Sequence, residues 1–189
     1  TADVTLAAKV ITNAKVRRCT VCNALDCLVV EQAIAKKLFV KLAPQLKKYS
    51  VEVRADQPSY ALLKKLYPVE LLKPATAKDF GHEFLALRMS IKTVPSSQAG
   101  IQFVQHHTSG HSEAIITRNN KIAANFQQQV DAAAVYVNTS TAFTDGFEFG
   151  LGAEIGISTQ KLHARGPMGL ASLTTYKWFV HSAGATRRS

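Results

Sequence analysis

Between residues 5 and 137, apolar runs of strand length alternate with stretches that have the period of an amphipathic helix. This alternation is typical of an α/β fold, because a helix carries the chain back between successive parallel strands. We therefore expect an open, largely parallel sheet with flanking helices. The predicted helices cover residues 5–15, 32–48, 59–67, 98–106 and 119–130, and the predicted strands cover residues 51–53, 84–94, 114–117 and 132–137.

Local signals set the expected boundaries of the first elements. Asp3 can accept hydrogen bonds from the free N–H groups at the start of the first helix and is its expected N-cap. Residues 20–23 are expected to form a loop, whereas periodicity leaves open whether residues 25–30 form a buried strand or a helical turn. Pro44 is expected to kink the second helix or to end its regular part, because proline lacks a backbone N–H.

The character of the chain changes after Asn138. Residues 139–170 contain six of the ten glycines and no long apolar period, so we expect a loop-rich segment there. Residues 173–180 alternate again, as a strand at a sheet edge or a strand exchanged with another subunit does. We therefore divide the chain into an α/β domain (1–138) and a glycine-rich returning loop with a terminal strand (139–189).

The net charge of +10 is concentrated at the two ends of the chain. Residues 1–54 carry ten Lys/Arg against four Asp/Glu, and residues 158–189 carry five against none. An anionic small-molecule partner is therefore expected, either a phosphorylated or carboxylate substrate or a nucleotide cofactor. A nucleic-acid partner is disfavoured, because the basic ends lack a dense Lys/Arg stripe with interleaved aromatic residues.

The number of cysteines and the length of the apolar runs indicate where in the cell the protein is expected to be located. Three cysteines in 189 residues do not suit a secreted disulfide framework, so we expect a reducing, cytoplasmic location. The first residues lack the pattern of a signal peptide, and the apolar runs are too short to cross a bilayer. No membrane partner is expected.

All three cysteines fall within nine residues, at positions 19, 22 and 27. Cys22 is the first candidate for a reactive residue, since three basic residues just upstream would favour its thiolate. Cys27 lies in an apolar run and is expected to be a small buried hydrophobe. Cys19 and Cys22 also form a Cys-x-x-Cys pair, which leaves a redox dithiol or half of a zinc site open, although no second such pair supplies further ligands.

A second group of polar residues lies in the glycine-rich segment. His163 and Arg165, flanked by glycines that allow close approach of the backbone, are candidates to hold an anionic group. A purely structural loop, in which His163 is hydrogen-bonded to a backbone carbonyl, explains the same residues equally well. The run Phe149-Gly-Leu-Gly-Ala-Glu is not the dinucleotide-binding fingerprint, which needs a preceding strand and Gly-x-Gly-x-x-Gly opening a helix.

Three ordered stretches resemble one known family. The first combines Asn13-Ala-Lys with Val21-Cys-Asn-Ala, and the second is Gly110-His-Ser-Glu-Ala-Ile. The third and longest runs from Phe149 to Tyr176. It includes the run Gly-Ile-Ser-Thr-Gln-Lys-Leu-His-Ala-Arg-Gly-Pro-Met-Gly-Leu. The chain resembles the gamma-glutamyl phosphate reductases (glutamate-5-semialdehyde dehydrogenases) of the aldehyde dehydrogenase superfamily. The resemblance implies an aldehyde-dehydrogenase-like catalytic domain, followed by a returning loop and an oligomerisation strand.

The resemblance also implies roles for particular residues. Cys22 corresponds to the nucleophile, and Glu83 lies where related dehydrogenases keep a glutamate near the nicotinamide ribose. With Cys22 in this role, its own backbone N–H and that of Asn23 are expected to help hold the oxyanion. The candidates for binding substrate or phosphate are Lys15, Arg18, His163 and Arg165.

The implied reaction is NADPH-dependent reduction of L-glutamyl 5-phosphate to L-glutamate 5-semialdehyde with release of phosphate, in proline biosynthesis. The Cys22 thiolate attacks the acyl phosphate, and hydride reduces the resulting thioester. Phosphate is a good leaving group, so no carboxylate base is needed beside the thiol, and the lack of acids from residue 5 to residue 25 agrees with this. The terminal strand, paired with a neighbouring subunit, predicts a homo-oligomer built on dimers.

The chain also departs from the family pattern. Ala142 stands where the family has an arginine, so one plausible anion contact is lost. No nucleotide-binding domain precedes the cysteine segment, and the chain therefore resembles a C-terminal portion. The alternatives are an inactive or regulatory fragment that keeps the fold without binding cofactor, and a Cys19–Cys22 redox or metal site. The positions that differ from the family are Cys19, Thr20, Asp26, Cys27, Ala142 and Phe147.

Overall fold

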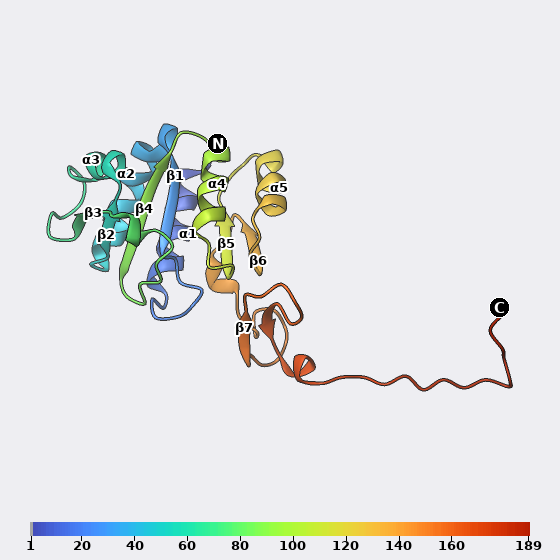
Figure 1. Cartoon of the computed structure of the whole chain (residues 1–189). Coiled ribbons are helices and arrows are strands. Elements are labelled where there is room, and N and C mark those ends of the chain that lie inside the picture. Colours follow the sequence, from blue (N-terminus) through green and yellow to red (C-terminus); the bar gives the residue numbers. More distant parts are fainter. Residues whose placement is uncertain (1) are drawn as a thin grey trace.

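The computed structural model describes residues 2–189, and its larger part is built on a four-stranded parallel sheet (Figure 1). The strands lie in the order β1 (Cys27–Glu31), β4 (Arg88–Val94), β2 (Glu52–Ala55) and β3 (Leu72–Pro74), and each neighbouring pair is parallel. The helices that accompany these strands are α1 (Val4–Val16), α2 (Gln32–Lys48) and α3 (Gln57–Leu63), with a 3₁₀ turn, η1 (Ala77–Asp79).

A smaller parallel pair of strands, β5 (Ser112–Ile115) and β6 (Ala134–Val137), lies beside the first sheet without being hydrogen-bonded to it (Figure 1). Helices α4 (Ser97–His107) and α5 (Asn120–Gln129) carry the chain into these strands. Because α4 contacts β1, β4 and α5, it bridges the two sheets. Within residues 2–189, no helix combines the length and the apolar character needed to cross a bilayer.

The principal core lies between the four-stranded sheet and the helices α1 and α2. The buried face of α2 follows the predicted helical period, with Leu38, Phe39 and Leu42 at most 2% exposed. From the sheet, Val53 of β2 and Met89 of β4 are both 0% exposed. Full burial of one such side chain contributes about 1.5–3 kcal/mol. This packing provides a rigid base for the loops that precede the strands.

Several predicted boundaries agree with the structure. Asp3 caps α1 by accepting the N–H groups of Thr5 and Leu6, at 2.9 and 3.1 Å. Residues 20–23 form turns, and most of the undecided segment at 25–30 belongs to strand β1.

Two details go beyond the predictions. Of the two effects expected of Pro44, a kink or an end of the regular helix, the second does not occur: α2 continues to Lys48, because side chains on both sides of the proline are buried and their packing outweighs its cost. The short strand β3 was not predicted, since three residues ending in Pro74 carry almost no periodicity. Proline is tolerated there because β3 is an edge strand.

The C-terminal segment is loop-rich, as predicted. It contains a 3₁₀ turn η2 (Thr141–Phe143), an antiparallel pair β7 (Gly156–Ser158) and β8 (Gly166–Met168), and a last 3₁₀ turn η3 (Leu170–Leu173). Residues 174–189 then extend away from the fold (Figure 1). The strand predicted at 173–180 pairs with nothing in residues 2–189, because no sheet edge of the same chain lies beside it.

Candidate active site

A cavity of about 410 Å³ lies at the amino ends of β1, β4 and β5. Most of its wall comes from three segments far apart in sequence: residues 22–27 at the start of β1, residues 81–83 before β4, and members of residues 107–114 around the start of β5. Thr141 and Thr159 of the C-terminal segment complete it. Three of the predicted site residues, Cys22, Asn23 and Glu83, therefore line one cavity.

Hydrogen bonds from the C-terminal segment hold the loop that carries Cys22. The buried Asn23 side chain donates to the carbonyl of Thr144 (2.9 Å). In return, the Thr141 hydroxyl donates to the Asn23 carbonyl (2.7 Å). Residue 23 is thus held through both its side chain and its backbone, which fixes the neighbouring thiol at the cavity wall.

The surroundings of Cys22 do not favour its thiolate in this chain. The pKa of the thiol is raised above its ordinary value of 9.0, first by restricted contact with water and then by the carboxylates of Glu154 and Glu83. The backbone N–H groups of Cys22 and Asn23 act in the opposite direction. The upstream basic residues were expected to favour the thiolate or simply to face solvent. The two arginines are exposed, and the lysine is bound elsewhere.

Lys15 supports the loops from behind the cavity. Its side chain is 0% exposed, and its ammonium group donates to the Leu25 carbonyl (2.7 Å) and to the Asp26 carboxylate (3.4 Å). Asp26 also accepts the backbone N–H of Phe84, next to Glu83 (3.2 Å). Lys15 therefore stabilises two walls of the cavity without lining it, and its position does not match the expected contact with substrate or phosphate.

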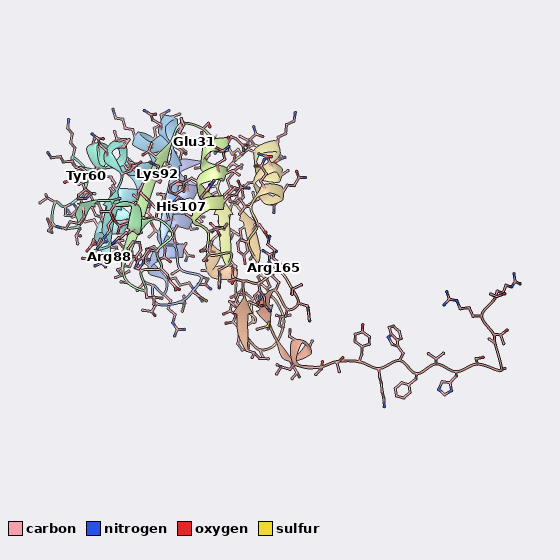
Figure 2. All side chains as sticks on the ribbon, viewed as in Figure 1. Glu31, Tyr60, Arg88, Lys92, His107 and Arg165 are labelled. Carbon is pink, nitrogen blue, oxygen red and sulfur yellow. The ribbon has the colours of Figure 1, made fainter. Side chains whose placement is uncertain are left out.

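The other candidate anion ligands also lie outside the cavity. Arg18 and His163 are exposed. Arg165 pairs with Asp131 (2.6 Å) on the side of the molecule that carries β7 and β8 (Figure 2). Within residues 2–189 no lysine or arginine lines the cavity, so the basic excess of the chain is not gathered there.

Folding brings to the cavity the carboxylates that the sequence around Cys22 lacks. The expectation of an acid-free surrounding holds along residues 5–25 but not in space. Burial raises the pKa of Glu113 to about 7, so this carboxyl group is partly protonated near neutral pH. The titratable carboxylates and imidazoles that line the cavity are Asp26, Glu83, Glu113, His82, His107 and His111.

All three cysteines are free thiols. Cys27, in β1, was expected to be buried but is only half-buried and lines the cavity. Restricted contact with water raises the pKa of its thiol to about 12, which leaves it protonated near neutral pH. Cys19 and Cys22 do not form a disulfide. In the described part of the chain, no cluster of three or more potential metal ligands is present. The Cys22 thiol is thus free for covalent chemistry.

His111 lines the cavity, and the sequence assigned it no role. Its side chain is buried (7% exposed), and its Nδ1 lies 2.6 Å from the hydroxyl of Ser112. That hydroxyl lies 2.6 Å from Thr144 Oγ1, which in turn lies 2.9 Å from Tyr136 OH. The stretch Gly110-His-Ser-Glu contributed to the family resemblance, but only the fold reveals this network.

The chain is closely similar to known gamma-glutamyl phosphate reductases. The enzyme from Bacteroides fragilis is 53% identical over 98% of this chain and 45% of its own length. The crystal structure of the one from Thermotoga maritima matches 100% of this chain and 44% of that chain, with 44% identity and a TM-score of 0.91. Over nearly its whole length, this chain matches part of the gamma-glutamyl phosphate reductases in both sequence and fold. It spans a little under half the length of the curated relatives that it matches. No protein-family model matches it.

More distant structures share the fold of this family. A propionaldehyde dehydrogenase from Clostridium phytofermentans is 18% identical, with a TM-score of 0.64 over 92% of this chain and 46% of that one. An engineered glycolyl-CoA reductase with bound NADP⁺ is 13% identical, with a TM-score of 0.63 over the same shares. The predicted aldehyde-dehydrogenase-like fold with a largely parallel sheet is confirmed.

Proposed function

We propose that this chain is the catalytic part of an NADPH-dependent gamma-glutamyl phosphate reductase, which reduces L-glutamyl 5-phosphate in proline biosynthesis. The observation that supports this most is the meeting of Cys22 and Glu83 at one cavity. In this proposal residues 1–138 form the catalytic domain, residues 139–189 form the returning loop and terminal segment, and the rest of the enzyme supplies the nucleotide-binding domain. The free thiols suit a reducing cytoplasm.

Cys22 is the nucleophile in this proposal. Its thiolate attacks the acyl carbon, the carbon–oxygen bond to phosphate breaks, and phosphate leaves with the bonding electrons. The backbone N–H groups of Cys22 and Asn23, which already act on the thiol, can donate to the acyl oxygen as it becomes negative. After hydride adds to the thioester carbon, the carbon–sulfur bond breaks, the aldehyde leaves and the thiolate is restored.

NADPH supplies the hydride when it is bound. Within this chain, Glu83 has suitable chemistry to hold it, because an exposed carboxylate at the cavity wall can accept hydrogen bonds from ribose hydroxyls. The backbone around Glu83 is held by the bond from Phe84 to Asp26. At Gly81 this backbone has a φ of 74° and passes close to the His107 carbonyl. A Cβ added at Gly81 would lie only 2.9 Å from that oxygen, so the position requires glycine.

Acetyl phosphate, a simple acyl phosphate, tests the first step on this chain itself. We expect intact-mass analysis to show the transfer of one acetyl group to Cys22 and its release by hydroxylamine. The initial rate should rise with pH from neutrality up to the thiol pKa, because that pKa is raised above 9.0 and only the thiolate attacks.

Single substitutions make this measurement specific. Cys22→Ser should remove the hydroxylamine-sensitive acetyl group, whereas Cys19→Ser and Cys27→Ser should keep it. Acetylation that resists hydroxylamine would indicate modification of lysines and contradict the assignment of the nucleophile, as would a rate that does not change with pH.

We also propose that the extended tail pairs with a neighbouring subunit in a homo-oligomer built on dimers. Tyr176, Trp178 and Val180 are 79%, 81% and 86% exposed, and an apolar surface of this kind is commonly covered by a partner. Light scattering of the complete enzyme should show a dimer or a multiple of it, and deletion of residues 174–189 should produce monomers. A monodisperse monomer that retains the tail would refute this pairing.

A further inference from the structure

His111 Nε2 is a buried polar atom that no protein group satisfies. Among the buried side-chain nitrogen and oxygen atoms of residues 2–189, two lack a hydrogen-bond partner: Arg88 Nε and His111 Nε2. Arg88 Nε nevertheless lies 2.7 Å from the Glu52 carboxylate in an ion pair, so only the histidine nitrogen is left unmatched. A buried polar group without a partner destabilises the fold, because it has lost its hydrogen bonds to water. At a cavity wall, such an atom indicates a ligand.

A chain of hydroxyl groups holds the other ring nitrogen of His111. If Tyr136 donates to Thr144, Thr144 to Ser112, and Ser112 to His111 Nδ1, each hydroxyl uses its single proton. The imidazole proton then resides on Nε2, which makes this nitrogen a donor on a residue of the cavity wall. Burial lowers the pKa of His111, which keeps the ring neutral at neutral pH.

His111 and Cys22 lie in the same part of the cavity. Both line its wall, and the carboxylates of Glu83 and Glu154 act on the imidazole as well as on the thiol. Since no lysine or arginine of residues 2–189 lines this cavity, a charged side chain of this chain is not available to stabilise a developing negative charge. A neutral N–H donor in the wall of the same cavity can supply part of that stabilisation.

One residue also links the imidazole to the nucleophile loop. Thr144 is 0% exposed, and its hydroxyl lies 2.6 Å from that of Ser112, the partner of His111. The Thr144 carbonyl accepts the side chain of Asn23, the residue after Cys22 (2.9 Å). The position of the ring relative to the thiol is thus fixed by a short series of hydrogen bonds.

We propose that the Nε2–H of His111 donates a hydrogen bond to the acyl oxygen of the substrate when Cys22 attacks it. This donor acts at the same oxygen as the backbone N–H groups of Cys22 and Asn23. It stabilises the negative charge on that oxygen twice, once on attack and once when hydride adds, and it keeps its proton throughout. The role rests on the proposed function, because it requires an acyl group bound at Cys22.

In the complete enzyme, His111→Phe should lower kcat about 10²–10³-fold with little change in KM, because a donor is lost where charge develops. His111→Gln should return kcat to within about tenfold of the parent, since its amide can place an N–H near the position of Nε2–H. The same His→Phe change at the exposed His106 should have no effect. Alkylation of Cys22 by iodoacetamide should be equally fast in all variants, which reports an intact site.

Full turnover by His111→Phe would overturn this role, and so would equal losses in His111→Phe and His111→Gln. The result for Cys22→Ser separates the two proposals. If that variant is inactive while His111→Phe is fully active, the reductase function stands and the role of His111 fails. If Cys22→Ser retains turnover, the proposed function fails and the role of His111 fails with it.

Discussion

Replacing Cys22 by serine in the complete enzyme is expected to lower kcat by roughly 10⁴-fold or more, because the group that accepts the acyl chain is lost. Near neutral pH a serine hydroxyl is a far weaker nucleophile than a thiol, even one whose pKa is raised by its surroundings. An oxygen ester is also a poorer hydride acceptor than a thioester. The measurement is steady-state consumption of NADPH together with formation of the aldehyde at saturating acyl phosphate.

The neighbouring cysteines provide matched controls for that substitution. Cys19 does not line the cavity, and the Cys27 thiol has a pKa of about 12, so neither is expected to react. Cys19→Ser and Cys27→Ser should therefore keep most of the turnover, although the second places a polar group in β1 and can lower the melting temperature. Substantial turnover by Cys22→Ser would show that another residue carries the chemistry.

Lys15→Ala is expected to lower the free energy of unfolding by about 3 kcal/mol. The change empties a fully buried position and leaves the Leu25 carbonyl and the Asp26 carboxylate without their cation. For a chain of 189 residues this corresponds to a fall of roughly 6–12 °C in the melting temperature. Thermal unfolding followed by circular dichroism measures it.

Two variants on the same helix sharpen this test. Lys9 is exposed on α1, so Lys9→Ala should change the stability by no more than about 0.5 kcal/mol. Lys15→Met fills the buried space without the charge, and it should cost less than Lys15→Ala because the partly exposed Asp26 keeps contact with water. If Lys15→Ala instead left the melting temperature unchanged and raised the KM for the acyl phosphate, the residue would be an anion ligand after all.

The fold was largely predictable because its elements are long and strongly periodic. The helix at residues 32–48 has the predicted bounds, since its inward positions recur at the helical period over more than four turns. Elements without such periodicity were missed or misjudged. The strand β3 is only three residues long. Residues 173–180 alternate like a strand but pair with nothing in residues 2–189.

The candidate site was less predictable than the fold. Cys22 was proposed first from its basic neighbours and then, with Glu83, from the family resemblance, and both line the cavity. Lys15 does not line it, because sequence does not show which member of a basic run is buried. The cavity lies at the amino ends of its parallel strands, although ligands of open α/β sheets usually bind at the carboxyl ends. The network around His111 depends on Thr144, which is distant in sequence and fully buried.

The two parallel sheets share no hydrogen bonds, although Cys22 precedes β1 in one sheet and His111 precedes β5 in the other. Apart from the packing of α4 between the sheets, the loops that carry the thiol and the imidazole are joined by hydrogen bonds among Asn23, Thr144 and Ser112 rather than by a backbone ladder. Breaking so few bonds costs less free energy than melting either sheet. We therefore expect heat or denaturant to separate these two cavity loops while the secondary structure is still intact.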